Sequence, residues 1–109
     1  MADNGRLAVL VLDERRRAQI LLAGELDLDA AGLLEQSVAT ILESPRVRQI
    51  EVDVALVLFC DAGGLSALLG ARHRAEQRQV PLYLVQVRAV LQKVLDASGL
   101  NGMFRRPAE

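Results

Sequence analysis

The chain has 109 residues, of which 51% are hydrophobic and 25% charged, a composition typical of one globular domain. Its formal net charge of −1 argues against nucleic acid as the main partner, because phosphate binding needs a basic field. The single cysteine, Cys60, excludes an internal disulfide and a cysteine-rich metal site, and the apolar runs are too short to cross a bilayer.

The first part of the chain predicts a β-hairpin. Two short apolar runs, residues 7–12 and 18–23, flank the charged segment DERRR, as expected for antiparallel strands joined by an exposed turn. No basic segment or cleavage-like site accompanies the first run, so we interpret it as a strand and expect a cytoplasmic protein without membrane insertion. We interpret Arg15, Arg16 and Arg17 as a solvated turn, not as a nucleic-acid site. An exposed edge at residues 7–12 would favour a homodimer.

The pattern then alternates between helix and strand. Apolar residues recur at helical spacing over residues 34–42, and Asp27 or Asp29 can cap free N–H groups in front of that helix. Residues 48–59 form an alternating and then continuous apolar run, which predicts a strand that Asp61 stops.

The second half repeats this alternation. A second helix follows from Leu65, then a strand over residues 80–85, a third helix that Gly99 ends, and a short last strand at Met103 and Phe104. The predicted apolar face of the second helix consists of Leu65, Leu68, Leu69 and Arg72.

This order of elements predicts an α/β fold. Strands that alternate with helices need a largely parallel sheet, and the N-terminal hairpin makes that sheet mixed. We therefore expect a single domain over residues 1–109, with its core at about 7–104 and a loose tail at 105–109.

The residues that could carry catalysis do not form a credible set. Glu25 and Asp27 share a strand face with Asp29, but a carboxylate pair needs an opposing catalytic group or a metal. His73 lies among arginines, as a solvated helix residue does, and Cys60 ends an apolar strand, which favours a small buried hydrophobe. We therefore expect neither an enzyme nor a bound cofactor or metal.

The segment DAGGL, residues 61–65, joins the central strand to the second helix. Asp61 is placed to cap the helix, so Ala62, Gly63 and Gly64 form its first turn, where glycine costs up to ~1 kcal/mol against alanine. One interpretation is close packing that leaves no room for a Cβ atom. The other is a flat surface with exposed N–H groups on which a partner sits.

Three blocks follow one another along the sequence: GELDLDAAGLLEQSVATIL, IEVDVALVLFCDAGGLSALLGARHRA and VPLYLVQVRAVLQKVLDASGLNGMF. In this order they resemble a STAS domain, in particular the bacterial anti-sigma-factor antagonists. The resemblance covers residues 7–104 and implies a STAS fold: a mixed sheet of four or five strands with an N-terminal hairpin and three or more helices packed on it.

The resemblance also implies a partner and a switch. Members of that family bind a GHKL-type anti-sigma kinase, which phosphorylates a Ser or Thr at the head of the second helix. The usual motif reads Asp-Ser-Ser/Thr-Gly-Leu, and Asp61, Gly64 and Leu65 match it. Gly63 stands at the acceptor position and Ala62 replaces the preceding hydroxyl, so the resemblance implies an antagonist without its phosphorylation switch.

The surface that this resemblance assigns to the partner combines the segment before the first helix with the start of the second helix. Ser66 offers an alternative acceptor, although a position inside the helix favours a structural role. The residues expected to contact the partner are Glu25, Asp27, Asp61, Ala62, Gly63, Gly64, Leu65 and Ser66.

Two alternatives stay open. The first is a STAS subunit of a larger complex, such as a lipid-transport ABC system, which docks through the same surface and needs no phosphoacceptor. The second is a small-ligand or nucleotide-binding module, which draws only on the helix N-terminus and the weak Gly-Gly signal.

Overall fold

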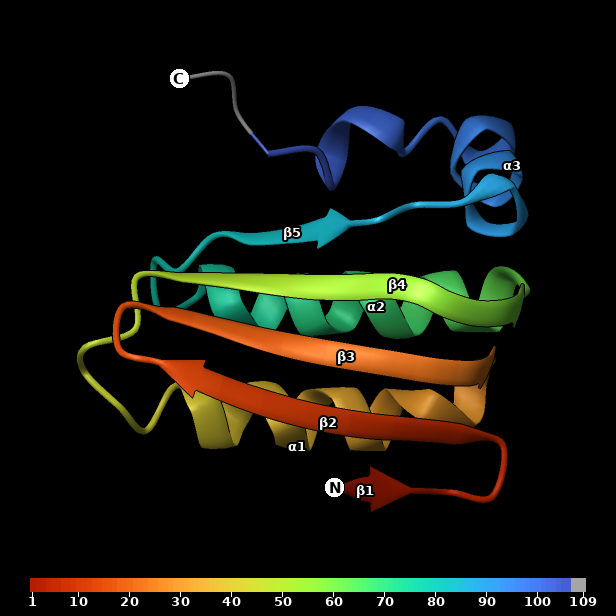
Figure 1. Cartoon of the computed structure of the whole chain (residues 1–109). Helices are drawn as coiled ribbons and strands as arrows, with labels where there is room; N and C mark the ends of the chain where they lie inside the picture. Colours follow the sequence, from red (N-terminus) through yellow and green to blue (C-terminus); the bar gives the residue numbers. More distant parts are fainter. Residues whose placement is uncertain (107–109) are drawn as a thin grey trace.

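One mixed sheet runs through the computed structural model, which describes residues 1–106 (Figure 1). Its strand order is β1-β2-β3-β4-β5, with antiparallel pairing from β1 to β3 and parallel pairing from β3 to β5. The predicted α/β fold with a mixed sheet is therefore confirmed. The strands are β1 (Ala2–Asp3), β2 (Leu7–Glu14), β3 (Arg17–Leu26), β4 (Gln49–Cys60) and β5 (Leu82–Val85).

The hairpin turn is tighter than the sequence predicts. Glu14 pairs with Arg17 in register, so only Arg15 and Arg16 form the turn, and Arg15 takes a φ of 64°. Cross-strand pairing extends both strands into the charged segment, because exposed strand ends tolerate charge.

Helices cover only one face of the sheet. The 3₁₀ turn η1 (Leu28–Ala30) leads into α1 (Ala31–Ile41), which lies with α2 (Ala62–Glu76) behind the sheet in Figure 1. The third helix, α3 (Ala89–Ser98), lies beyond β5 and ends at Gly99, whose φ is 72°. The prediction that Gly99 ends this helix is confirmed.

The core lies between the sheet and the helices. Alternate residues of β3 and β4, such as Ile20, Leu22 and Val52, point inward and are buried. They meet Leu34 of α1 and Leu68 of α2, which are buried as well. Helices and strands therefore share one apolar interior. Within residues 1–106, no helix has both the length and the apolar character that crossing a membrane requires.

Two predictions about the second half are wrong. Met103 lies in the 3₁₀ turn η2 (Asn101–Met103), not in a strand, and only the Phe104 carbonyl joins the sheet edge, accepting from Leu84 N–H at 3.0 Å. Arg72 does not line the buried face of α2, because that face continues through the smaller Ala71. Arg72 instead donates from Nε to the Met103 carbonyl at 3.1 Å.

β1 and Phe104 lie at the two edges of the sheet. β1 pairs with Ala8 and Val9, so it covers part of the outer edge of β2 that we expected to be exposed. Of the predicted tail at 105–109, residues 107–109 lie outside the described part. The Arg106 guanidinium lies 5.7 Å from the Tyr83 ring centre and 3.7 Å from Glu51.

Candidate functional site

The junction between β4 and α2 has the geometry that the sequence predicts. Asp61 adopts an extended backbone directly after β4, and its Oδ1 accepts a hydrogen bond from Gly64 N–H at 2.8 Å. Its carbonyl accepts from Leu65 N–H at 3.0 Å, the first bond of the helix. Asp61 is therefore the N-cap of α2 and sets where the helix begins.

Gly64 is required by packing. A Cβ atom built on Gly64 would lie 2.0 Å from the carbonyl oxygen of Leu26 and 2.6 Å from its carbon. These are backbone atoms at the end of β3, so they cannot rotate away. For Gly64 the close-packing interpretation is therefore correct.

Gly63 is restricted by a different neighbour. A Cβ atom there would lie 2.9 Å from both the Cβ and the backbone N of Leu28, in the turn η1. Gly63 itself is half-buried, whereas the Leu28 side chain is 65% exposed. Any side chain at position 63 must therefore displace η1 or distort the start of α2.

Three carboxylates lie on the segment that leads into α1, and an arginine binds two of them. Arg6 lies 3.2 Å from Asp27 and also forms an ion pair with Asp29. Asp27 Oδ1 accepts from Asp29 N–H at 3.0 Å, so Asp27 caps η1 rather than α1 itself. Glu25, next to the last residue of β3, is exposed and forms no ion pair within residues 1–106.

The predicted partner-binding residues divide into accessible and buried ones. Gly64 and Leu65 are buried, so both pack the start of α2 against the interior of the fold. Asp27 and Gly63 are half-buried. The exposed members are Glu25, Asp61, Ala62 and Ser66.

Two apolar side chains beside this junction are exposed, which the sequence pattern does not indicate. Leu58 is 75% exposed and Phe59 is 46% exposed, and Phe59 pairs in register with Glu25. The continuous apolar run at the end of this strand gives no sign that part of it is exposed. The register of β4 against β3 shifts here, so Val57 and Cys60 face the core and the two residues between them do not.

Cys60 behaves as a buried thiol. Its side chain is 8% exposed, and Sγ donates to the Asp61 carbonyl at 3.5 Å. Burial, together with the Asp61 carboxylate, raises the pKa of Cys60 to about 11. The thiol is therefore protonated near neutral pH, which leaves it a poor nucleophile.

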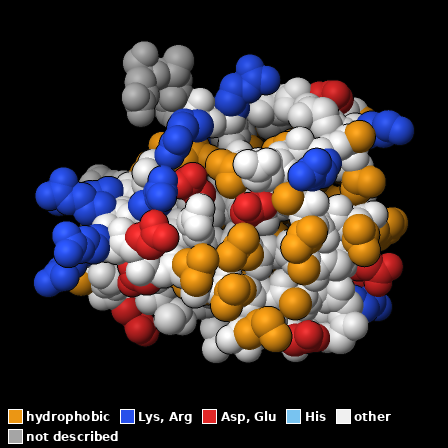
Figure 2. Space-filling model, in the orientation of Figure 1, with side chains coloured by type: hydrophobic (Ala, Val, Ile, Leu, Met, Phe, Trp, Pro, Cys, Tyr) orange, Lys and Arg blue, Asp and Glu red, His pale blue; other side chains and the backbone are white. Residues whose placement is uncertain are grey.

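The side of the sheet away from α1 and α2 is open and largely apolar. Figure 2 shows hydrophobic side chains gathered on this face, and Leu10, Leu21 and Leu56 line a hollow of about 350 Å³ there with Asp53. No helix from residues 1–106 covers this face (Figure 1). Within the same residues, no group of three His, Cys, Asp or Glu side chains is placed to hold a metal ion.

Comparisons with known proteins agree with this architecture. A family model described as "Mlab, STAS domain" matches residues 10–105. The anti-sigma factor antagonist SpoIIAA, a cell fate determinant of Bacillus, is 25% identical in its unphosphorylated form, with a TM-score of 0.73 over 94% of this chain and 89% of that one.

Two further solved structures share the fold at lower identity. An anti-sigma factor antagonist from Mycobacterium paratuberculosis is 21% identical, with a TM-score of 0.72 over 99% of this chain and 92% of that one. A sulfate transporter family protein from Wolinella succinogenes is 22% identical, with a TM-score of 0.71 over 85% of this chain and 75% of that one.

Proposed function

Because this chain belongs to the STAS domain family, we propose that it is a regulatory protein-binding module of the anti-sigma-factor-antagonist type. In this proposal it works in the cytoplasm, has no enzymatic activity and docks on a GHKL-type anti-sigma kinase. The observation that carries the proposal is the junction at Asp61, where a capped helix start lies beside exposed apolar side chains.

The surface around this junction has the composition of a protein interface. Leu28 and Phe59 supply exposed apolar area, and the exposed Ala62 adds a flat helix start beside Asp61. Glu25 and Ser66 lie at its rim, where water can reach them. Protein interfaces commonly combine an apolar centre with such a polar rim.

The same surface lacks a phosphoacceptor at position 63. Glycine has no hydroxyl, and any Cβ at this position would come within 2.9 Å of Leu28. A phosphate would add close to two negative charges beside Asp61 and would weaken docking. Without it, we expect the complex to stay bound in the presence of ATP.

The test is a binding and kinase assay with an intact-mass readout. The wild-type protein is incubated with ATP and the GHKL-type kinase of its own genome, beside Gly63→Ser and Gly63→Ala. The alanine variant is the matched control, because it adds the same Cβ against Leu28 without a hydroxyl. We expect wild type to bind and keep its mass, and only Gly63→Ser to gain a phosphate.

Two results would contradict this proposal. A phosphate on the wild-type protein that disappears in Ser66→Ala would make Ser66 the acceptor and the switch intact. Failure of the wild type to bind any such kinase would exclude the antagonist function, whatever happens at position 63.

A second candidate is a STAS subunit of a larger complex, such as a lipid-transport ABC system. The absence of a hydroxyl at Gly63 favours it, since such a subunit needs no phosphoacceptor. The similarity to a sulfate transporter family protein fits this class of role as well. Purification of the tagged chain with an ABC ATPase and permease, and without a kinase, would support this function.

A further inference from the structure

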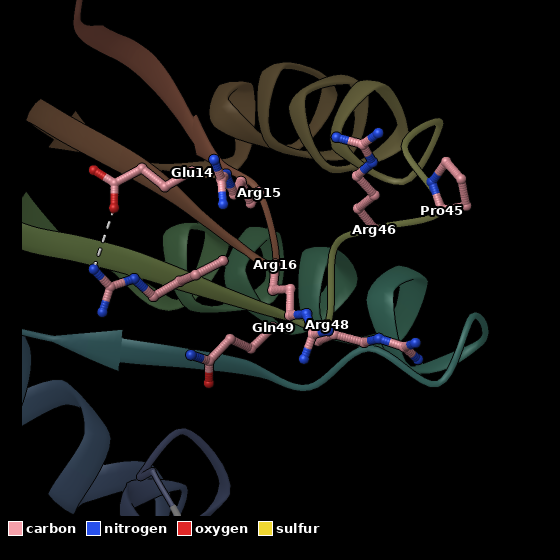
Figure 3. Close-up of a pocket in the computed structure, with 8 residues that line it drawn as sticks. Glu14, Arg15, Arg16, Pro45, Arg46, Arg48 and Gln49 are labelled. Carbon is pink, nitrogen blue, oxygen red and sulfur yellow. Dashed lines mark hydrogen bonds and ion pairs between the residues drawn. The ribbon is translucent and has the colours of Figure 1, made fainter.

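The end of the molecule opposite the Asp61 junction carries a hollow lined by arginines. β4 begins at this end with Gln49 and reaches the junction at Cys60. The hollow measures about 820 Å³ and lies between the β2–β3 turn and the loop that joins α1 to β4 (Figure 3). We call it the arginine basin; its lining residues are Glu14, Arg15, Arg16, Arg17, Pro45, Arg46, Arg48 and Gln49.

Hydrogen bonds hold the two loops of the basin side by side. The Arg16 carbonyl accepts from the backbone N–H of Arg48 at 2.6 Å and from that of Gln49 at 3.2 Å. The backbone positions of these arginines are therefore fixed, and only their long side chains can move. Arg15 and Arg46 extend on either side of the hollow (Figure 3).

The positive charge of the basin is mostly uncompensated. Arg17 pairs with Glu14 at 3.3 Å and with Glu51 at 3.2 Å. Among residues 1–106, no carboxylate lies within ion-pair distance of Arg15, Arg16, Arg46 or Arg48. The whole chain has a net charge of −1, yet five arginines line this one hollow. Figure 2 shows blue side chains gathered at this end, besides others along the top and right of the view.

We propose that the arginine basin binds an acidic segment of a partner protein, with several Asp or Glu side chains in a row. A guanidinium group binds a carboxylate through two parallel hydrogen bonds, and an anionic partner relieves the repulsion between neighbouring arginines. The side chains of Arg15 and Arg48 point in different directions (Figure 3). Such divergent donors fit charges spaced along an extended chain better than one compact phosphate.

The lining disfavours other polyanions. Among residues 1–106, no aromatic side chain borders the basin, so a nucleobase has nothing on which to stack. Of the lining residues in the described part of the chain, Pro45 alone has no polar side chain, so none of them would insert into a lipid surface. The basin and the Asp61 junction lie at opposite ends of β4, so this inference does not depend on the kinase proposal.

The test measures binding of a fluorescein-labelled octa-glutamate peptide by fluorescence anisotropy. The basin variant combines Arg15→Gln, Arg46→Gln and Arg48→Gln. We expect wild type to bind the peptide more weakly as salt rises, because salt screens exposed charges. We expect the basin variant to lose affinity about tenfold, equivalent to about 1.4 kcal/mol.

A matched control removes the same number of charges elsewhere. Arg88→Gln, Lys93→Gln and Arg105→Gln are exposed positions outside the basin, and this triple variant should bind as wild type does. Thermal denaturation of both variants checks that they fold. If both variants lost the same affinity for the peptide, binding would depend on the net charge of the protein and not on the basin, and the proposal would be overturned.

Competition experiments decide the class of partner. Tripolyphosphate, phosphatidylglycerol vesicles and a single-stranded oligonucleotide are titrated against the bound peptide. Displacement by tripolyphosphate at equal or lower concentration than unlabelled peptide would identify a small-phosphate site instead. Basin-dependent binding of vesicles or oligonucleotide without peptide binding, or no peptide binding at all, would also refute an acidic protein segment.

Discussion

Substituting Gly64 by alanine tests whether the start of α2 is packed as closely as the geometry indicates. In an unrestricted helix this change stabilises by up to ~1 kcal/mol, because alanine has the higher helix propensity. Here the new methyl would lie 2.0 Å from the Leu26 carbonyl oxygen and 3.1 Å from Cys60 Sγ. The helix must move away from β3 to admit it, so we expect the opposite sign.

The magnitude follows from the cost of overpacking. An extra methyl group in a tightly packed interior typically costs about 1–3 kcal/mol. The entropy of unfolding scales with chain length, so each kcal/mol shifts the Tm of a chain of this size by about 4 °C. We therefore expect Gly64→Ala to lower Tm by roughly 4–12 °C.

Gly70→Ala is the control on the same helix. A Cβ at Gly70 would meet only the Glu35 Oε1 atom, at 3.5 Å, which is ordinary van der Waals contact. We expect this variant to be as stable as wild type or more stable, in urea titration as in thermal scans. A Gly64→Ala protein that matched Gly70→Ala in stability would refute the reasoning that backbone contact dictates glycine at position 64.

Three further changes probe the same region and the outer sheet face. Asp61→Ala should cost about 1 kcal/mol of unfolding free energy through loss of the helix cap, while Asp61→Asn should retain most of it; urea titration of both variants checks this. The pKa of Cys60 is raised from 9.0 to about 11, so the folded state disfavours the thiolate, and stability should fall as pH rises from 9.0 towards 11. Cys60→Ala should lack this part of the pH dependence, and identical stability profiles for the two proteins would contradict the assignment. Glu51, whose side chain is 7% exposed, lies 3.2 Å from Arg17, so Arg17→Ala should destabilise by about 1–3 kcal/mol. Adding Glu51→Gln should recover part of that loss, and additive losses in the double-mutant cycle would show that the two groups are not coupled.

Much of the fold could be predicted because its signals are local. Asp61 follows an apolar strand and precedes a helical pattern, which is enough to identify a cap. Gly99 ends α3 for the same kind of reason, since glycine readily adopts its φ of 72°. The last strand was wrong because Met103 and Phe104 have strand-like side chains but only one backbone bond to the sheet edge.

The candidate site was less predictable because it depends on contacts between distant segments. The sequence leaves open whether Gly63 and Gly64 serve packing or a partner, and only the position of Leu26 and Leu28 decides. Arg6 binds two carboxylates from more than twenty positions away in the chain. No spacing rule predicts such a pairing.

The strands β3 and β4 also fix the distance between the arginine basin and the Asp61 junction. β3 and β4 run side by side from the arginine basin to the Asp61 junction, and at about 3.3 Å per residue the span of β3 is roughly 30 Å. Proteins bound at the two ends would therefore be held apart by a rigid spacer. A single partner that engaged both ends would need a linker of about nine extended residues or more between its two contact segments.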